Sequence, residues 1–98
     1  MEIKKLQNEI KRMFDKSSRF KKHTKEGIMT HIVEELGEVS RQLINEKYRK
    51  DKFDKKKLAE EIGDVLILIN YLSSEYDIDL SKEMESKLKR LKKRVNSK

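Results

Sequence analysis

The chain has 98 residues, of which 25 are Lys or Arg and 18 are Asp or Glu, so its formal net charge is +7. This length predicts one domain over residues 1–98, and so short a chain gains stability from self-association, so we expect an oligomer. The absence of cysteine excludes disulfides and thiolate chemistry, which leaves carboxylates and two histidines, His23 and His31, as metal ligands.

No apolar run approaches the ~20 residues that span a bilayer, and the first residues lack the apolar segment of a signal peptide. We therefore expect a cytoplasmic protein without membrane contact. The apolar residues recur mostly at intervals of three and four, and the sequence contains no proline, which together predict an all-α fold.

The first two helices are predicted from apolar periodicity and one capping residue. A helix over about residues 2–16 has an apolar stripe composed of Ile3, Leu6, Ile10, Met13 and Phe14. Thr24 is typical of a residue that caps a second helix, which is expected to fade near Tyr48. The apolar face of this second helix is composed of Ile28, Ile32, Leu36, Val39 and Leu43.

The third and fourth helices follow a solvated connection at residues 50–53. Asp54 can cap the third helix. The apolar face expected for the third helix comprises Leu58, Ile62, Val65, Leu66, Ile69 and Leu72. The fourth helix begins near Ser81, and residues 81–98 hold eight basic and two acidic side chains, or +6 of the net charge. Because the charge is local, we do not expect nucleic acid as the partner.

Two acidic side chains lie unusually close to the apolar face of the third helix. At about 100° per residue, Glu61 falls inside the edge of that face and Asp64 lies beside it. On the second helix, His31, Glu35, Glu38 and Gln42 follow one another at intervals of four, three and four. If the two helices pack antiparallel, as a short connection favours, four carboxylates face one another across the groove.

Two interpretations of these carboxylates are open. Like charges beside an apolar surface repel one another and lose solvation, so a divalent cation such as Mg²⁺, with Mn²⁺ as a substitute, would stabilise them. A bound Mg²⁺ typically also bridges phosphate oxygens. Alternatively, the glutamates pair with lysines on ordinary solvated helix faces.

Two segments of the sequence, residues 31–39 (HIVEELGEV) and 58–66 (LAEEIGDVL), together resemble a known family. They resemble the MazG-like, all-α nucleoside triphosphate pyrophosphohydrolases, whose signature is Glu-Glu-x-x-Glu on one helix and Glu-x-x-Asp on the next. The resemblance covers about residues 24–95. It implies a small four-helix domain with antiparallel central helices that assembles into a helical bundle, as a homodimer or homotetramer.

The resemblance also implies a reaction and a set of site residues. The expected reaction is Mg²⁺-dependent hydrolysis of an NTP or dNTP between the α- and β-phosphates, giving a nucleoside monophosphate and pyrophosphate. Carried over by motif position, the metal ligands are Glu35, Glu38, Glu61 and Asp64. Glu34 matches the first motif glutamate, as a further ligand or a base that orients water, so the expected catalytic residues are Glu34, Glu35 and Glu38.

The family often continues with Lys, Asn and Arg at helical spacing in the last helix, where they hold phosphates. Lys87 and Arg94 fit that spacing, whereas Leu91 occupies the position of the Asn. His31 and Tyr71 are candidates for contact with the base, although each also fits an ordinary packing or flanking role. Phe14 and Phe20 could wall a base pocket or belong to the core.

The expected role is house-cleaning or control of nucleotide pools. Two alternatives remain open at the level of sequence. One is phosphoribosyl-ATP pyrophosphohydrolase, which belongs to the same helical superfamily. The other is a non-catalytic basic helical module that binds nucleic acid or a partner helix through the last segment.

Overall fold

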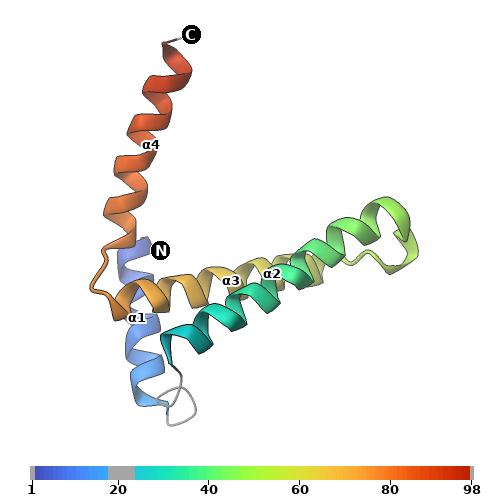
Figure 1. Cartoon of the computed structure of the whole chain (residues 1–98), viewed down its shortest axis with the longest axis horizontal. Coiled ribbons are helices and arrows are strands. Elements are labelled where there is room, and N and C mark those ends of the chain that lie inside the picture. Colours follow the sequence, from blue (N-terminus) through green and yellow to red (C-terminus); the bar gives the residue numbers. More distant parts are fainter. Residues whose placement is uncertain (1, 18–23, 98) are drawn as a thin grey trace.

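The computed structural model describes residues 2–17 and 24–97, and these residues form helices joined by short connections, without a strand. Figure 1 shows the chain order: α1 (Ile3–Lys16), α2 (Lys25–Tyr48), the short 3₁₀ turn η1 (Lys50–Lys52), α3 (Lys55–Glu75) and α4 (Leu80–Asn96). The predicted all-α class is therefore confirmed. None of the described helices is long and apolar enough to cross a membrane.

The two central helices, α2 and α3, form a long antiparallel hairpin (Figure 1). Both predicted caps are present: Thr24 Oγ1 accepts a hydrogen bond from the Gly27 N–H at 3.0 Å, and Asp54 Oδ1 accepts from the N–H groups of Lys56 and Lys57. The connection at residues 50–53 is largely exposed, as predicted, and it also has local structure. Residues 50–52 form one 3₁₀ turn, and the Asp54 N–H donates to the buried Gln42 side chain at 3.0 Å, which ties the turn to α2.

The core lies where α1 crosses the end of the hairpin. Its buried apolar residues are Ile10, Phe14, Ile28, Ile32, Val65, Leu68 and Tyr71. Phe14 stacks on Tyr71 with ring centroids 4.4 Å apart and an interplanar angle of 22°. Such aromatic pairs add about 0.5–1.5 kcal/mol to the contribution of apolar burial. The contact therefore fixes α1 against α3.

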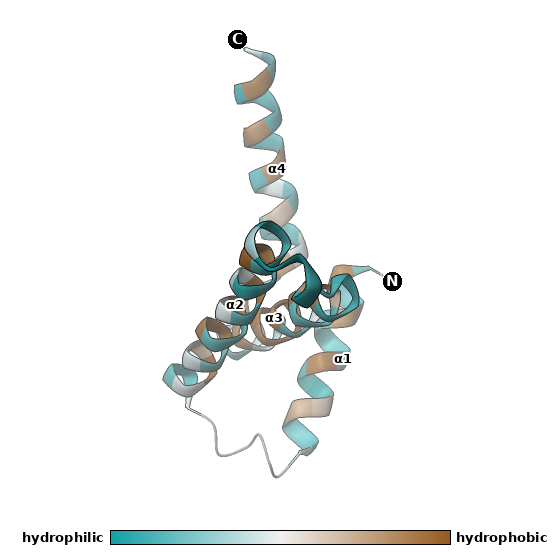
Figure 2. Ribbon diagram, turned by 90° about the vertical axis from the view of Figure 1, so that its right-hand side faces the viewer, coloured by the Kyte–Doolittle hydropathy of each residue, from teal (hydrophilic) through white to brown (hydrophobic). Residues whose placement is uncertain are grey.

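The predicted apolar faces are only partly buried. Six residues predicted on those faces are at least 38% exposed: Leu6, Met13, Leu36, Leu43, Ile62 and Leu66. These residues do lie on helices, as their spacing predicts, but one copy of the chain has too few helices to cover every apolar side. On α1, the polar Gln7 is buried in place of Leu6 and Met13. Figure 2 shows apolar residues along α2, α3 and α4, and several of them are exposed in the described part of the chain.

The last helix, α4, begins at Leu80, one residue before the predicted start near Ser81. Its cap is Asp79, whose Oδ1 accepts a hydrogen bond from the Lys82 N–H at 3.1 Å. The preceding turn contains Asp77 in the left-handed region, with φ 54°. Instead of lying along the hairpin, α4 contacts the start of α1 and projects away from α2 and α3 (Figure 1). The four helices thus form a hairpin that α1 crosses at one end and from which α4 projects.

Candidate functional site

The hairpin brings the predicted acidic residues of α2 and α3 to one side of the molecule. Glu61 follows the spacing of Val65 and Leu68 on the buried face of α3, and only 7% of Glu61 is exposed. The periodicity thus predicted its burial correctly. Within the described part of the chain, Glu61 Oε2 has no hydrogen-bond partner. Because an unsatisfied buried carboxylate oxygen is costly, this atom indicates a site that accepts a ligand.

The electrostatics of Glu61 show which other acids lie near it. Burial raises the pKa of Glu61 above its ordinary value, and the negative charges of Glu38, Glu35 and Asp64 raise it further. The ammonium group of Lys57 acts in the opposite direction. The predicted acids of both helices are therefore electrostatic neighbours, and their mutual repulsion is only partly offset by one lysine.

His31 lies on the same border of α2, as predicted. Its Nε2 is 3.4 Å from Glu35 Oε1, which is one helical turn further along. A cavity of about 230 Å³ opens beside this pair. Its lining residues are Phe14, His31, Glu35, Asp64, Ile67 and Leu68. The cavity thus joins an apolar wall from α1 and α3 to acidic side chains of α2 and α3.

The acidic side chains of α2 and α3 are candidates for a metal site. Across residues 2–17 and 24–97, no three His, Asp or Glu side chains are gathered closely enough to hold one ion together. The chemistry of the donors nevertheless fits a hard divalent cation, since all are carboxylate oxygens and one of them is buried without a partner. The residues that could hold such an ion are those of the acidic cluster, which we define as Glu35, Glu38, Glu61 and Asp64.

The other predicted site residues lie at several places on α2, α3 and α4. Glu34 is exposed on α2, next to the cluster in sequence. Tyr71 is buried against Phe14, which favours a packing role for Tyr71 over contact with the base. Lys87 and Arg94 lie on α4, which projects away from the hairpin, so the structure does not bring them to the acids of the same chain (Figure 1). Phe20 and His23 lie outside the described residues.

One residue near the cluster was missed at the level of sequence. Lys57 is four residues before Glu61 on α3, and its charge lowers the pKa of that carboxyl. The i, i+4 spacing of a lysine and a glutamate was the available signal. Lys57 was overlooked because it falls in a run of three lysines, where charge alone does not distinguish one from its neighbours.

The comparison with protein families assigns the all-α hairpin and its paired acidic motifs to a class of nucleotide hydrolases. Residues 23–97 match the MazG nucleotide pyrophosphohydrolase domain. The chain therefore belongs to the MazG family and is a nucleotide pyrophosphohydrolase, a hydrolase. Neither the search of curated proteins nor that of solved structures found a match.

Membership of this family separates a nucleotide hydrolase from a non-catalytic basic module. Nucleotides fit its members as substrates, and the enzymes generally depend on a divalent metal. The prediction of a nucleotide hydrolase is confirmed at this level, in preference to a non-catalytic basic module.

Proposed function

We propose that the chain hydrolyses nucleoside or deoxynucleoside triphosphates to the monophosphate and pyrophosphate, with Mg²⁺ as the cofactor and Mn²⁺ as a substitute. The observation that carries this proposal is the buried Glu61 oxygen without a partner, set among three further acids. A carboxylate cluster of this kind is stabilised by cations, and a triphosphate is the anionic substrate that such cations would hold.

In this proposal Glu35 and Glu38 on α2 and Glu61 and Asp64 on α3 would hold the metal. When bound, the metal would neutralise phosphate charge and lower the pKa of the attacking water. Glu34, exposed at the edge of the cluster, accepts a proton from water or serves as a further ligand. Water adds across the α–β anhydride, so one P–O bond forms, one breaks, and pyrophosphate leaves.

The rest of the substrate would be held beside this cluster. The cavity next to His31 and Phe14 is the place for the nucleoside, with His31 as the polar contact to the base. Tyr71 supports Phe14 from behind through their stacked rings. Lys87 and Arg94 contribute positive charge toward the phosphates, and the enzyme acts as a homodimer or homotetramer in house-cleaning or pool control.

The test is an assay of purified protein with a panel of NTPs, dNTPs and phosphoribosyl-ATP, with and without Mg²⁺. We expect monophosphate and pyrophosphate only when Mg²⁺ is present. Glu38→Gln and Asp64→Asn should each lower the rate by at least about 100-fold, because each removes a charged metal ligand. Release of orthophosphate, or unchanged activity in both variants, would contradict the proposal.

The matched control for these variants is Glu60→Gln. Glu60 is exposed and precedes Glu61 directly, but at about 100° away it lies on the solvent side of α3. It carries the same charge change as Glu38→Gln without touching the cluster. Its activity should stay close to that of the wild type, which separates loss of a ligand from loss of net charge.

A further inference from the structure

A basic surface lies at the tip of the hairpin, at the end far from α1 (Figure 1). We define the basic tip as residues 47–57, which comprise the end of α2, η1 and the start of α3. This segment holds seven basic and two acidic side chains, or +5. The proposed hydrolysis assigns no role to the basic residues, and all of them are exposed: Lys47, Arg49, Lys50, Lys52, Lys55, Lys56 and Lys57.

The positive charge of the basic tip is not paired within the chain. The ion pairs among the described residues involve none of the seven basic side chains. Of the two acids in the segment, Asp54 caps α3, because its Oδ1 accepts hydrogen bonds from the N–H groups of Lys56 and Lys57. The like charges repel one another, so a polyanion that binds them relieves a cost that the free protein bears.

The backbone of the basic tip is held in place by two buried amide side chains of α2. Gln42 Oε1 accepts a hydrogen bond from the Asp54 N–H at 3.0 Å. Asn45 Nδ2 donates to the Lys52 carbonyl at 3.5 Å, and the Arg49 N–H donates to the Asn45 carbonyl at 2.8 Å. Because these bonds order the backbone before a ligand arrives, binding costs the tip little conformational entropy.

The basic tip also has an exposed aromatic side chain. Tyr48 is 71% exposed, the largest exposed fraction among the large apolar side chains of the described residues. Lys47 Nζ lies 5.3 Å from the centroid of the Tyr48 ring, so a cation accompanies this ring. Single-stranded nucleic acid binds to surfaces of this composition, because cations hold its phosphates and aromatic rings stack on its unpaired bases.

An anionic membrane is a poorer fit to the same surface. An element that lies in a lipid interface needs an apolar face as well as positive charge. Within residues 47–57 the large apolar side chains are Tyr48 and Phe53, and Phe53 is partly buried. So little exposed apolar surface beside so many cations favours a polyanion over a lipid surface.

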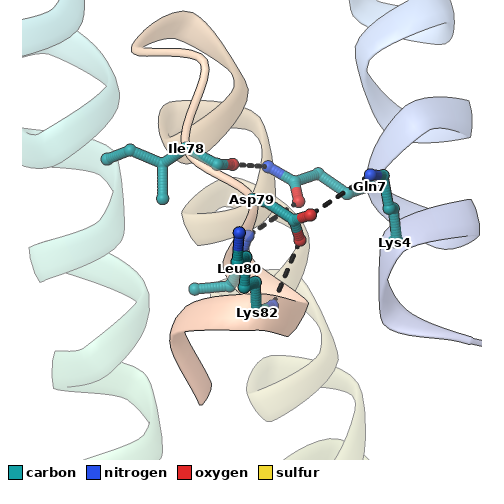
Figure 3. Close-up of polar contacts among 6 residues, drawn as sticks. All are labelled: Lys4, Gln7, Ile78, Asp79, Leu80 and Lys82. Carbon is teal, nitrogen blue, oxygen red and sulfur yellow. Dashed lines mark hydrogen bonds and ion pairs between the residues drawn. The ribbon is translucent and has the colours of Figure 1, made fainter. Parts of the chain in front are cut away.

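The other basic segment, α4, lies apart from the tip, because a joint with α1 sets its direction (Figure 3). At this joint the Gln7 side chain donates a hydrogen bond to the Ile78 carbonyl at 2.8 Å and accepts one from the Leu80 N–H at 3.2 Å. Lys4 Nζ lies 3.2 Å from the Asp79 carboxylate, which also caps α4. Since α4 projects from the opposite end of the hairpin (Figure 1), its lysines provide a control for those of the tip.

We propose that the basic tip binds single-stranded nucleic acid, with phosphates held by its basic side chains and an unpaired base stacked on Tyr48. The local charge that argued against nucleic acid at the level of sequence is that of residues 81–98, whereas this surface is formed by a different segment. The acidic cluster takes no part in this binding, so nucleic acid and nucleotide occupy separate places on the hairpin.

The test measures binding of a fluorescent RNA of about 15 nucleotides to the full chain by anisotropy, at about 0.15 M salt. The tip variant combines Arg49→Ala, Lys50→Ala and Lys52→Ala, which leaves Lys57 beside Glu61 in place. We expect the affinity to fall at least about tenfold and the slope of log K against log salt to fall by about 2, since each phosphate contact contributes about 0.7. DNA of the same sequence is measured in parallel, and the strand that binds more tightly identifies the source of the ligand.

The matched control for the tip variant combines Lys89→Ala, Lys92→Ala and Lys93→Ala on α4. It removes the same charge from the other basic segment and should bind RNA as the wild type does. Both triple variants should retain nucleotide hydrolysis, so the readout is separate from the proposed function. Equal losses of RNA affinity in the two variants would show that only net charge matters and would overturn the proposal.

A second pair of variants tests the aromatic contact. Tyr48→Ala should weaken RNA binding about tenfold, whereas Tyr48→Phe keeps the ring and should retain the affinity. Unchanged affinity in Tyr48→Ala would overturn the stacked base. Equal binding to duplex RNA, to poly-glutamate or to vesicles of phosphatidylserine and phosphatidylcholine would overturn the assignment to single strands.

Discussion

Replacement of Gln7 by leucine is predicted to be one of the most damaging changes outside the apolar core. Leucine has a similar volume but cannot hydrogen-bond, so Gln7→Leu leaves the Ile78 carbonyl and the Leu80 N–H without their partner. Gln7 is only 5% exposed, so water replaces these bonds poorly. Each unsatisfied buried group costs about 1–3 kcal/mol, and since both hydrogen bonds are only partly buried, the lower part of that range gives roughly 2–3 kcal/mol for the pair.

For a domain of this size, such a loss lowers the melting temperature by about 10–20 °C. Thermal unfolding followed by circular dichroism at one protein concentration measures it. Lys4→Ala is the control at the same joint, since it removes only a solvated ion pair with Asp79 and should change the melting temperature by less than about 4 °C. An unchanged melting temperature for Gln7→Leu, or an equal loss for Lys4→Ala, would refute the idea that buried hydrogen bonds set the direction of α4.

Three further predictions concern the site, the core and a cap. In metal-free buffer at neutral pH, Glu61→Gln should raise the melting temperature, because it removes the carboxylate that the other acids repel most. The same variant should abolish turnover, because it removes a proposed metal ligand. Mg²⁺ should raise the melting temperature of the wild type but not that of the variant. Burial, with a hydrogen bond to Glu75, raises the pKa of Tyr71 from 10.0 to about 12, so the folded state favours the neutral phenol. The contribution of Tyr71 to the free energy of unfolding should therefore be complete below pH 10 and should be lost as the pH rises to about 12. Tyr71→Phe should remove this alkaline loss in pH-dependent melting curves; a loss of equal size in the variant would contradict the assignment. Asp54→Ala should cost about 1 kcal/mol in denaturant unfolding by removing the cap of α3, with Asp51→Ala as a control near zero, and equal costs would count against the cap.

Features that depend on local chemistry could be predicted from the sequence. Thr24 and Asp54 are caps because their side chains reach N–H groups two or three residues ahead, and such contacts need no information about the rest of the fold. The burial of Glu61 could be predicted for the same kind of reason. Helical geometry fixes its angle relative to Val65 and Leu68, whatever packs against that face.

Features that depend on distant contacts could not be predicted. Gln7 is buried because it meets the turn before α4, more than 70 residues away in the sequence. Periodicity marked Leu6 and Met13 as core, and it also marked Leu36 and Ile62, all of which are exposed in one copy. An amphipathic pattern shows that a face is apolar, but it does not show whether the covering surface belongs to the same chain.

The separation of acids from bases on this chain has a physical consequence for binding. If Lys87 could reach Glu61 in the free protein, the two side chains would pair, and the lysine would occupy the place of a cation. The only cationic side chain found to act on the Glu61 charge among the described residues is Lys57. Because the joint with α1 holds α4 away from the hairpin, the basic side chains of α4 do not pair with the carboxylates of their own chain. Both charges are therefore still available when a polyanion and its counterions arrive together.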